Sequence, residues 1–542
     1  MKILGIAGGH DANWALVDDG RILGAYEKER FTRRRHDGGA VAELARQSLE
    51  ALRIAPREID LIATTEPVHK GLDSGARLLA GKKYCRPNEW QHHVVELFDR
   101  VFPAVSVPHH LCHAAYAAYT SPFSECIAVT LDGGGDLYTE EAYTCATVSQ
   151  WKQGRLQFLE SIPNVGFGSL WFTYARAIFG DGNDSGKLMG LSGYGDDALV
   201  EAFRDRFTAP VRGIFRGARA IKDCWPDFED PPFMNGVRSW QDTGAKRIAR
   251  AVQVLTTECA VDFMRSVKHA TSATKLVLGG GVALNGYMTT ALRRSALFTD
   301  CHVPPAVHDG GIALGAALFA CHNVLEYPWE PAAQPELAFL GNRYAPKPLP
   351  ELDGLPSAKM APEEAAILCA QELARGGVVA VHEGRSEHGP RALGNRSLLS
   401  GASLAGTRDR INSTIKFREG FRPLAPIVHQ QHAREYFELE WPSPYMMYIV
   451  ECKGSMRATC AEGCHIDGTA RVQTVSGRAG FMSHVLEAYE RETGVPVLLN
   501  TSFNLREPIV ETPQDAMRMF LKVPLSLMWI EGELVGKPHS LL

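Results

Sequence analysis

The stretch KILGIAGGHD, residues 2–11, sets the pattern of the chain, because a short apolar strand ends there in a glycine turn. Two further strands follow it, and the same order returns after residue 125, where a buried strand enters the turn DGGGD at 132–136. The predicted strands are 2–7, 14–17 and 21–27 in the first copy, and 126–131, 142–150 and 155–160 in the second. The repeat predicts two duplicated lobes.

The two glycine turns suggest what the lobes bind. Without a Cβ, glycine lets backbone N–H groups come close to phosphate oxygens, so two such turns could hold a nucleotide between them. A pair of ordinary β-hairpins is the alternative. A third glycine run fits the same core: a helix over 245–270 precedes a strand at 275–278, which enters GGGVALN at 279–285. Asp309 then opens an apolar helix over 312–324, where it could cap the helix or bind a cation.

Length and composition limit the class of protein. The 542 residues suggest about three or four domain-sized units. A net charge of −5 counts against a protein that coats nucleic acid, and the chain lacks an apolar run long enough to span a membrane. The 12 cysteines form no Cys-x-x-Cys pair and the N-terminus does not resemble a signal peptide, so we expect a reduced, cytoplasmic protein.

A proline-rich stretch predicts the domain boundary. Eight prolines lie between Pro328 and Pro362, where apolar periodicity disappears, so this stretch reads as an extended connection. We place the boundary near residue 350. This gives an N-terminal domain over 1–350, with its second lobe starting near residue 125, and a C-terminal domain over 351–542.

A histidine pair is the first candidate site. His109 and His113 are four residues apart, which puts both imidazoles on one helical face at a spacing suited to one metal ion. Asp132, at the end of the next strand, is the obvious third ligand, and Asp309 could be the fourth. Such a set suits iron, manganese or zinc. The alternative is a pair of structural histidines at a helix start.

A basic island is the second candidate site. Residues 384–428 hold eight basic and three acidic side chains, a net charge of +5. Because one guanidinium group can bind two phosphate or carboxylate oxygens at once, the island predicts a small polyanionic ligand. A solvated basic face is the alternative. A third element, the strand end LLNTSFN at 498–504, could hydrogen-bond a nucleotide but decides nothing alone.

The chain resembles the NodU/CmcH-type O-carbamoyltransferase family, which includes antibiotic-tailoring enzymes, from Ile3 nearly to the C-terminus. Several long motifs in the right order carry the resemblance. They are the Gly-His-Asp turn, His109-x-x-x-His113, GKLMGL at 186–191, residues 280–285, GPRALGNRS at 389–397, KFREGFRPLAP at 416–426 and NTSFN at 500–504. Ser185, Ser192 and Gly193 depart from the family pattern, which puts local loop shape in doubt.

The resemblance implies an α/β protein with a two-lobed N-terminal domain of the actin/hexokinase-like ATPase type and a C-terminal YrdC-like α/β domain. The C-terminal domain would use ATP and carbamoyl phosphate to make carbamoyl adenylate, and the N-terminal domain would pass the carbamoyl group to a hydroxyl of a small-molecule natural product, as in antibiotic biosynthesis. Mg²⁺ would accompany ATP. The implied metal is iron(II), held by His109, His113, Asp132 and Asp309.

The resemblance also assigns binding residues. Carbamoyl phosphate and the first nucleotide would be held by Arg391, Lys416, Arg422, Arg471, Asn500 and Ser502, with Lys416 and Arg422 also catalytic. In the N-terminal domain the nucleotide is expected at the glycine turns and the quoted motifs, through Gly133, Gly134, Lys187, Gly280, Gly281 and Asn285. An alcohol is a weak nucleophile near neutral pH, so we expect His10 or Asp11 on the first glycine turn to act as the general base. Alternatively, Asp11 only organises the turn.

Two other functions remain open from the sequence: a threonylcarbamoyl transferase that acts on tRNA, and a nucleotide-binding sensor without group transfer. The charge of −5 counts against the first, so we expect a hydroxylated small molecule as the partner and neither nucleic acid nor a membrane. The oligomeric state is open, a homodimer included. The irregular stretch 206–240 could wall the acceptor pocket or be a packed surface loop, and sugar hydroxyls, cephem alcohols and macrolide glycosides are all compatible.

Overall fold

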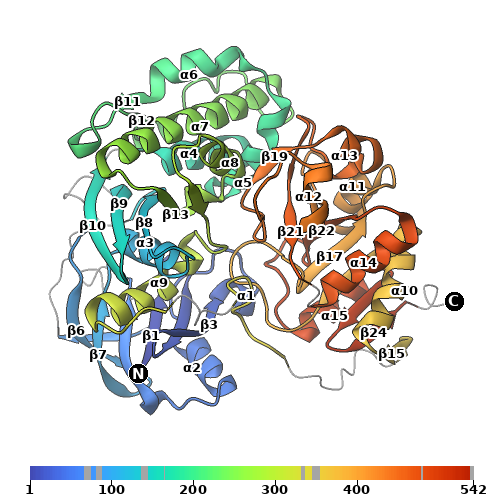
Figure 1. Cartoon of the computed structure of the whole chain (residues 1–542), viewed down its shortest axis with the longest axis horizontal. Coiled ribbons are helices and arrows are strands. Elements are labelled where there is room, and N and C mark those ends of the chain that lie inside the picture. Colours follow the sequence, from blue (N-terminus) through green and yellow to red (C-terminus); the bar gives the residue numbers. More distant parts are fainter. Residues whose placement is uncertain are drawn as a thin grey trace. The chain divides into compact units, whose positions relative to one another are not determined.

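The computed structural model has two compact units (Figure 1). One comprises Met1–Thr32 and His36–Leu337, and the other Arg33–Arg35 and Ala338–Leu542. The boundary predicted near residue 350 lies outside the described residues. The structure describes residues 1–65, 75–80, 88–135, 144–163, 165–330, 336–344, 354–477 and 480–537.

The N-terminal unit contains two sheets with one strand plan. In each, the first strand pairs antiparallel with the second and the second with the third, while the next two strands across the sheet add in parallel on the other side of the first. In the first sheet two further strands extend that edge with antiparallel pairing. The first sheet has the order β3-β2-β1-β4-β7-β6-β5, with β1 Lys2–Ala7, β2 Asn13–Asp18, β3 Arg21–Glu27, β4 Ile59–Thr64, β5 Arg77–Ala80, β6 Gln91–Leu97 and β7 Arg100–Ser106. The second has the order β10-β9-β8-β13-β14, with β8 Glu125–Leu131, β9 Thr144–Lys152, β10 Arg155–Pro163, β13 Lys275–Gly279 and β14 Asp300–His302. The repeated order confirms the duplicated two-lobed α/β fold.

Two central helices join the lobes. Helix α3 (His109–Tyr119) packs on β8 and β13, helix α9 (Ile312–Phe319) packs on β1 and β2, and the two helices pack on each other. Small residues allow this close approach, since a Cβ at Gly315 would overlap the carbonyl of Cys112 and one at Gly5 would overlap that of Ala313. The apolar helix predicted over 312–324 is α-helical to Phe319 and continues as a π-helical turn over Ala320–Val324.

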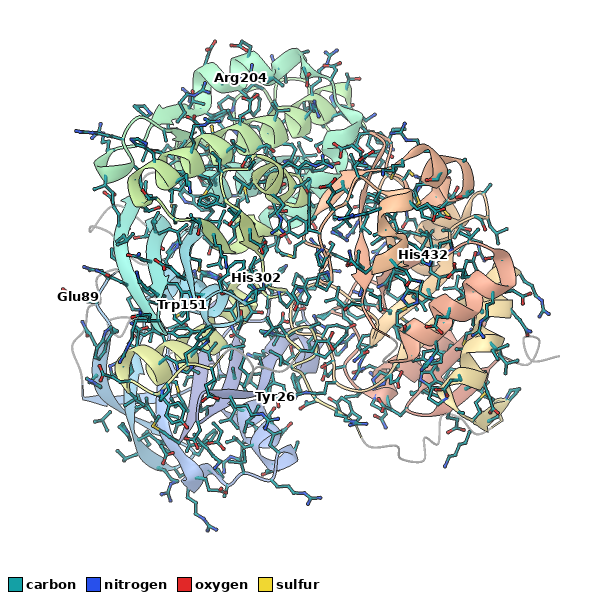
Figure 2. All side chains as sticks on the ribbon, in the orientation of Figure 1. Tyr26, Glu89, Trp151, Arg204, His302 and His432 are labelled. Atoms are coloured by element: carbon teal, nitrogen blue, oxygen red, sulfur yellow. The ribbon has the colours of Figure 1, made fainter. Side chains whose placement is uncertain are left out.

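Aromatic packing fills the second lobe beside these helices. Trp151 of β9 is fully buried, donates its indole N–H to the Phe123 carbonyl at 2.8 Å, and meets Tyr119 edge to face with ring centroids 4.5 Å apart (Figure 2). The remaining helices of this unit are α1 Lys28–Thr32, α2 Ala42–Ala51, α4 Phe167–Phe179, α5 Ser185–Leu191, α6 Val200–Phe207, α7 Thr243–Thr271 and α8 Gly286–Arg294. Helix α7 confirms the predicted helix over 245–270. The stretch 206–240 includes the short hairpin β11 Thr208–Pro210 and β12 Arg219–Ile221.

The C-terminal unit is a separate α/β unit built around one main sheet. Its sheet has the order β15-β24-β23-β16-β17-β22-β18-β21, with β15 Ser357–Lys359, β16 Val378–His382, β17 Arg396–Gly401, β18 Ala425–His429, β21 Gln473–Val475, β22 Val497–Ser502, β23 Leu527–Ile530 and β24 Glu533–Gly536. A small ladder joins β19 Ile449–Glu451 to β20 Thr469–Arg471. The helices are α10 Pro362–Ala374, α11 Thr407–Arg410, α12 Gln430–Tyr436, α13 Gly454–Thr459, α14 Phe481–Thr493 and α15 Pro513–Lys522.

Helices α10 and α14 pack together and bury their apolar faces with those of the central strands in one core, where Trp529 stacks on Phe481. Within its described part, the proline-rich connection contributes one strand, β15, which lies at the edge of the sheet. Among the helices in the described ranges, none combines the length and the apolarity needed to cross a bilayer.

Candidate functional site

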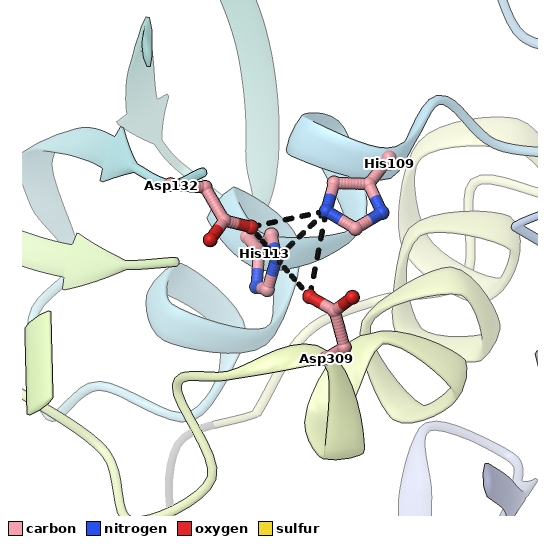
Figure 3. A group of neighbouring side chains, drawn as sticks. All are labelled: His109, His113, Asp132 and Asp309. Carbon is pink, nitrogen blue, oxygen red and sulfur yellow. Dashed lines mark hydrogen bonds and ion pairs between the residues drawn. The ribbon is translucent and has the colours of Figure 1, made fainter. Parts of the chain in front are cut away.

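Four predicted ligands converge in the N-terminal unit (Figure 3). Helix α3 begins at His109 and carries both imidazoles on one face, Asp132 follows β8, and Asp309 lies in the turn before α9. The Asp132 Oδ2 atom lies 3.2 Å from His109 Nε2 and 3.1 Å from His113 Nε2, and the Asp309 Oδ1 atom lies 3.6 and 3.3 Å from the same nitrogens. Helix α9 has no side-chain cap, so Asp309 faces the histidines instead of capping the helix.

The donor set fits a cation. The two Nε2 atoms approach each other to 3.1 Å while both face the same carboxylate oxygen. Hydrogen bonding between the rings cannot explain that approach when each ring also donates to Asp132, whereas two nitrogens and two carboxylates around one point suit a divalent transition metal. Burial alone would raise the pKa of Asp132, but the hydrogen bonds from His109 and His113 hold it well below its usual value.

The middle histidine of the motif takes no part in this cluster. His110 Nε2 lies 2.9 Å from the Thr144 carbonyl, which can only accept, so Nε2 carries the hydrogen and Nδ1 accepts from the Thr130 hydroxyl at 2.7 Å. Complete burial lowers the pKa of His110 to about 3, so the ring is neutral at physiological pH. His110 therefore has a structural role.

Two predicted phosphate turns meet at Asp132, one of the predicted metal ligands. Its second oxygen, Oδ1, accepts the Gly133 N–H at 2.8 Å and the Gly281 N–H at 3.2 Å. Gly280 has a φ of +86°, and a Cβ there would overlap the Leu131 carbonyl, so only glycine lets this turn reach Asp132. Gly134 belongs to the same turn as Gly133. The glycine turns of the second lobe thus lie beside the predicted metal ligands.

Two other residues predicted to bind the nucleotide have protein partners. Lys187 Nζ lies 2.8 Å from an Asp184 carboxylate oxygen. Asn285 Oδ1 caps helix α8 by accepting the Met288 N–H at 3.0 Å, and its Nδ2 donates to Gln253 Oε1 at 3.1 Å. Asn285 thus holds the turn after Gly281, and Lys187 would have to leave Asp184 to reach a phosphate.

The first glycine turn carries a second polar cluster. Asp11 has a φ of +56°, and its carboxylate lies 3.0 Å from His10 Nδ1 and 2.8 Å from His36 Nδ1. Burial would raise the pKa of Asp11, but the hydrogen bonds from His10 and His36 bring it well below its usual value. Asn13 Nδ2 donates to the carbonyls of Asp11 and Asp309, each at 2.8 Å, which ties this turn to one of the predicted metal ligands.

The C-terminal unit gathers a cationic cluster in which Lys416 is buried and the arginines are half-buried. Burial, followed by repulsion from neighbouring arginines, lowers the pKa of Arg418 to about 9 and that of Arg471 to about 10. The same causes hold the pKa values of Arg391 and Lys416 well below their usual range. Arg422 faces this cluster, with Glu419 3.8 Å away.

The cluster has unused hydrogen-bonding capacity. Within the described residues, the buried Nε atoms of Arg391 and Arg471 and the buried Oδ1 atom of Asn500 have no hydrogen-bond partner. Asn500 is fixed by its Nδ2, which donates to the Ala392 carbonyl at 3.1 Å and to Gln473 Oε1 at 3.0 Å. Buried, unpaired cations beside an unpaired acceptor are the arrangement that a ligand with both oxyanions and an N–H group would satisfy.

Lys416 has a different environment from the arginines. Its Nζ donates to the carbonyls of Ser502 and Asn504, each at 2.7 Å, and to the Ser502 hydroxyl at 3.3 Å. These acceptors are all neutral, and through them Lys416 fixes the end of β22. The structure therefore brings all six residues predicted for this site into one region.

Sequence reasoning missed three residues that belong to these sites, His36, Asn13 and Gln473, and it included Arg418 in the basic island without giving it a role of its own. Arg418 was inside the basic island and could have been assigned from its place between Lys416 and Arg422. The others gave no signal, because a lone histidine after three arginines, or a single amide in a strand, becomes functional only through its partners in space.

Comparisons with known proteins find similar chains over most of the sequence. The family model described as Carbamoyltransferase N-terminus matches residues 69–318, and the one described as Carbamoyltransferase C-terminus matches residues 370–537. Nodulation protein NolNO of Sinorhizobium fredii is 32% identical over 97% of this chain and 79% of that protein, and Nodulation protein U of the same species is 28% identical over the whole of both chains. Among solved structures, full-length HypF in its phosphate- and nucleotide-bound form matches 60% of this chain and 56% of that chain, with a TM-score of 0.35 and 15% identity.

Proposed function

Because the chain belongs to the carbamoyltransferase family, we propose that it activates carbamoyl phosphate with ATP and transfers the carbamoyl group to a hydroxyl of a small molecule. The observation that carries the proposal is the cluster of half-buried Arg391, Arg418, Arg422 and Arg471 with the buried Lys416, which has few acidic partners among the described residues. Buried cations of one sign destabilise a protein unless an anion neutralises them, so the cluster favours a ligand with several phosphate oxygens.

The first half-reaction would take place at this cluster. Carbamoyl phosphate loses its phosphate to water, the resulting carbamate oxygen attacks the α-phosphorus of ATP, and pyrophosphate leaves, giving carbamoyl adenylate. The arginines stabilise negative charge that develops on phosphate oxygens, with Mg²⁺ accompanying ATP. The unpaired Oδ1 atom of Asn500 can accept an N–H of the carbamoyl group, which a simple phosphate lacks.

The second half-reaction would take place in the N-terminal unit. His10 Nε2 accepts the proton of the acceptor hydroxyl, the hydroxyl oxygen bonds to the carbamoyl carbon, and the bond from that carbon to the AMP oxygen breaks. Asp11 stabilises the imidazolium through its hydrogen bond to His10 Nδ1. Backbone N–H groups of the glycine turns would hold the phosphate of the leaving AMP.

The four metal ligands would serve this step. His109, His113, Asp132 and Asp309 fit a divalent ion, with iron(II) proposed from the family resemblance, and such an ion supplies positive charge near the phosphate of the adenylate. Asp132 also orients the glycine turns, because its Oδ1 accepts the N–H groups of Gly133 and Gly281.

Separate assays of the two half-reactions test the proposal. Arg422→Ala should abolish the formation of AMP-linked product from ATP and labelled carbamoyl phosphate, yet leave transfer from supplied carbamoyl adenylate within about threefold of wild type. His113→Ala should do the reverse. Arg265→Ala, an exposed change on α7, is the control for both. Identical failure of both variants in both assays, with intact folding by circular dichroism, would refute the two-site scheme.

A further inference from the structure

The segment His36–Gly39 lies directly on the first glycine turn. The Ala12 N–H donates to the Asp37 carbonyl at 3.1 Å, and the Gly39 N–H donates to the Gly8 carbonyl at 2.5 Å. A Cβ at Gly38 would lie 2.8 Å from the Gly9 carbonyl oxygen, so glycine is needed for this close approach. The backbone of this segment therefore fixes His36 relative to the turn that carries His10 and Asp11.

Side-chain contacts also join this segment to the first glycine turn. His36 Nδ1 lies 2.8 Å from Asp11 Oδ1, and His10 Nδ1 lies 3.0 Å from Asp11 Oδ2. The two imidazole rings stack nearly parallel, with centroids 4.9 Å apart and an interplanar angle of 18°. An ionised carboxylate can only accept hydrogen bonds, so both Nδ1 atoms carry the hydrogen and each neutral ring keeps the lone pair of Nε2.

This cluster differs from the metal centre, although His10, Asp11 and His36 could also surround an ion. At the metal centre, two imidazole nitrogens face one oxygen of Asp132. At Asp11, each imidazole takes a different oxygen, which is the pattern of two separate hydrogen bonds. The geometry favours a carboxylate held on both sides over a second metal site.

We propose that His36 is a positioning residue: it holds Asp11 in the orientation that fixes His10 as the Nδ1–H tautomer, with Nε2 free to accept the proton of the acceptor hydroxyl. This inference rests on the proposed transfer reaction and adds a residue to it. His36 neither gains nor loses a proton in the step. Without it, the carboxylate can rotate or bind water, and His10 loses its fixed direction.

The test compares His36→Leu, which removes the donor, with His36→Asn, whose side-chain amide can replace the Nδ1–H donor. Transfer from preformed carbamoyl adenylate should fall about 10- to 100-fold in kcat for His36→Leu, with KM for the acceptor changed less than about threefold. His36→Asn should recover most of that loss. His92→Leu, an exposed histidine on β6 of the same unit, is the matched control and should behave as wild type.

Two further measurements separate the proposal from its premise. In His10→Ala, adding His36→Leu should cost nothing more, because His36 acts only through His10. Nitrogen-15 NMR should show His10 in the Nδ1–H tautomer in wild type and His36→Asn, and in mixed tautomers in His36→Leu. Additive losses, no rescue by asparagine, or an unchanged tautomer would overturn the role of His36. If the wild-type protein transfers no carbamoyl group, the proposed function fails, and the tautomer measurement still decides whether His36 orients His10.

Discussion

Replacing Asp132 with asparagine removes one negative charge from the metal centre at constant size. Asp132 is the ligand closest to both imidazoles, with Oδ2 at 3.1 and 3.2 Å from the two Nε2 atoms. Two unit charges about 4 Å apart interact by about 4 kcal/mol at an effective dielectric constant near 20. The asparagine oxygen recovers part of this as a neutral ligand. We therefore expect the dissociation constant for a divalent ion to rise at least about 100-fold, or about 2.8 kcal/mol.

The assay is a competition titration of the metal-free protein with iron(II), in the absence of oxygen, against a chromophoric chelator, with bound metal counted by mass spectrometry. His110→Gln is the matched control, because His110 lies in the same motif but bonds Thr130 and Thr144. It should lower Tm and leave metal affinity within about threefold of wild type. Equal metal affinity of Asp132→Asn and wild type, or a larger loss in His110→Gln, would refute this assignment of the ligands.

Three further predictions concern pH, charge and backbone strain. Burial would lower the pKa of His113, but its hydrogen bonds to Asp132 and Asp309 raise it above 6.5, so the metal-free protein should lose this stabilisation as pH rises through the folded pKa. Because a metal needs the neutral ring, added metal should raise Tm more at about pH 8 than at about pH 6; the opposite trend would contradict a metal role for His113. Arg391→Met should stabilise the ligand-free protein by about 1 kcal/mol in urea denaturation, since it removes a buried cation from a like-charged cluster, and should lose most of the Tm gain given by pyrophosphate. Gly280→Ala should cost about 3 kcal/mol or more, because it combines a positive φ with overlap at the Leu131 carbonyl, whereas Gly186→Ala, in open space on α5, should not destabilise; equal Tm values would show that the turn relaxes.

The sequence predicted best those features that depend on residues close together along the chain. The spacing of His109 and His113 predicted a shared face because a helix has 3.6 residues per turn, and α3 does begin at His109. The strand and glycine-turn repeat predicted the duplicated lobes, because strand period and turn chemistry are written in neighbouring residues. The sequence did not decide between a cap and a ligand for Asp309, since that depends on where a helix from elsewhere in the chain places its imidazoles.

The basic island shows a similar division. Its composition predicted an anion site, and the structure adds that the arginines are half-buried and that their charges repel one another. Gln473, which fixes Asn500, comes from a strand outside the island. Burial and orientation of a charged side chain depend on the whole sheet, so composition alone indicates the sign of the ligand's charge and not which atoms face it.

The amino-acid sequence by itself determined the repeated strand pattern, the pair of histidines, the sign of the second site and, through its motifs, the family. Only the tertiary structure decided that His110 lies outside the metal cluster, that Asp132 joins two glycine turns to two imidazoles, and that His36 holds Asp11. The physical reason is the separation along the chain over which each kind of interaction acts. Helical spacing and turn chemistry act over a few residues, whereas a hydrogen bond across 25 residues, or across the 296 between Asn13 and Asp309, exists only after the chain has folded.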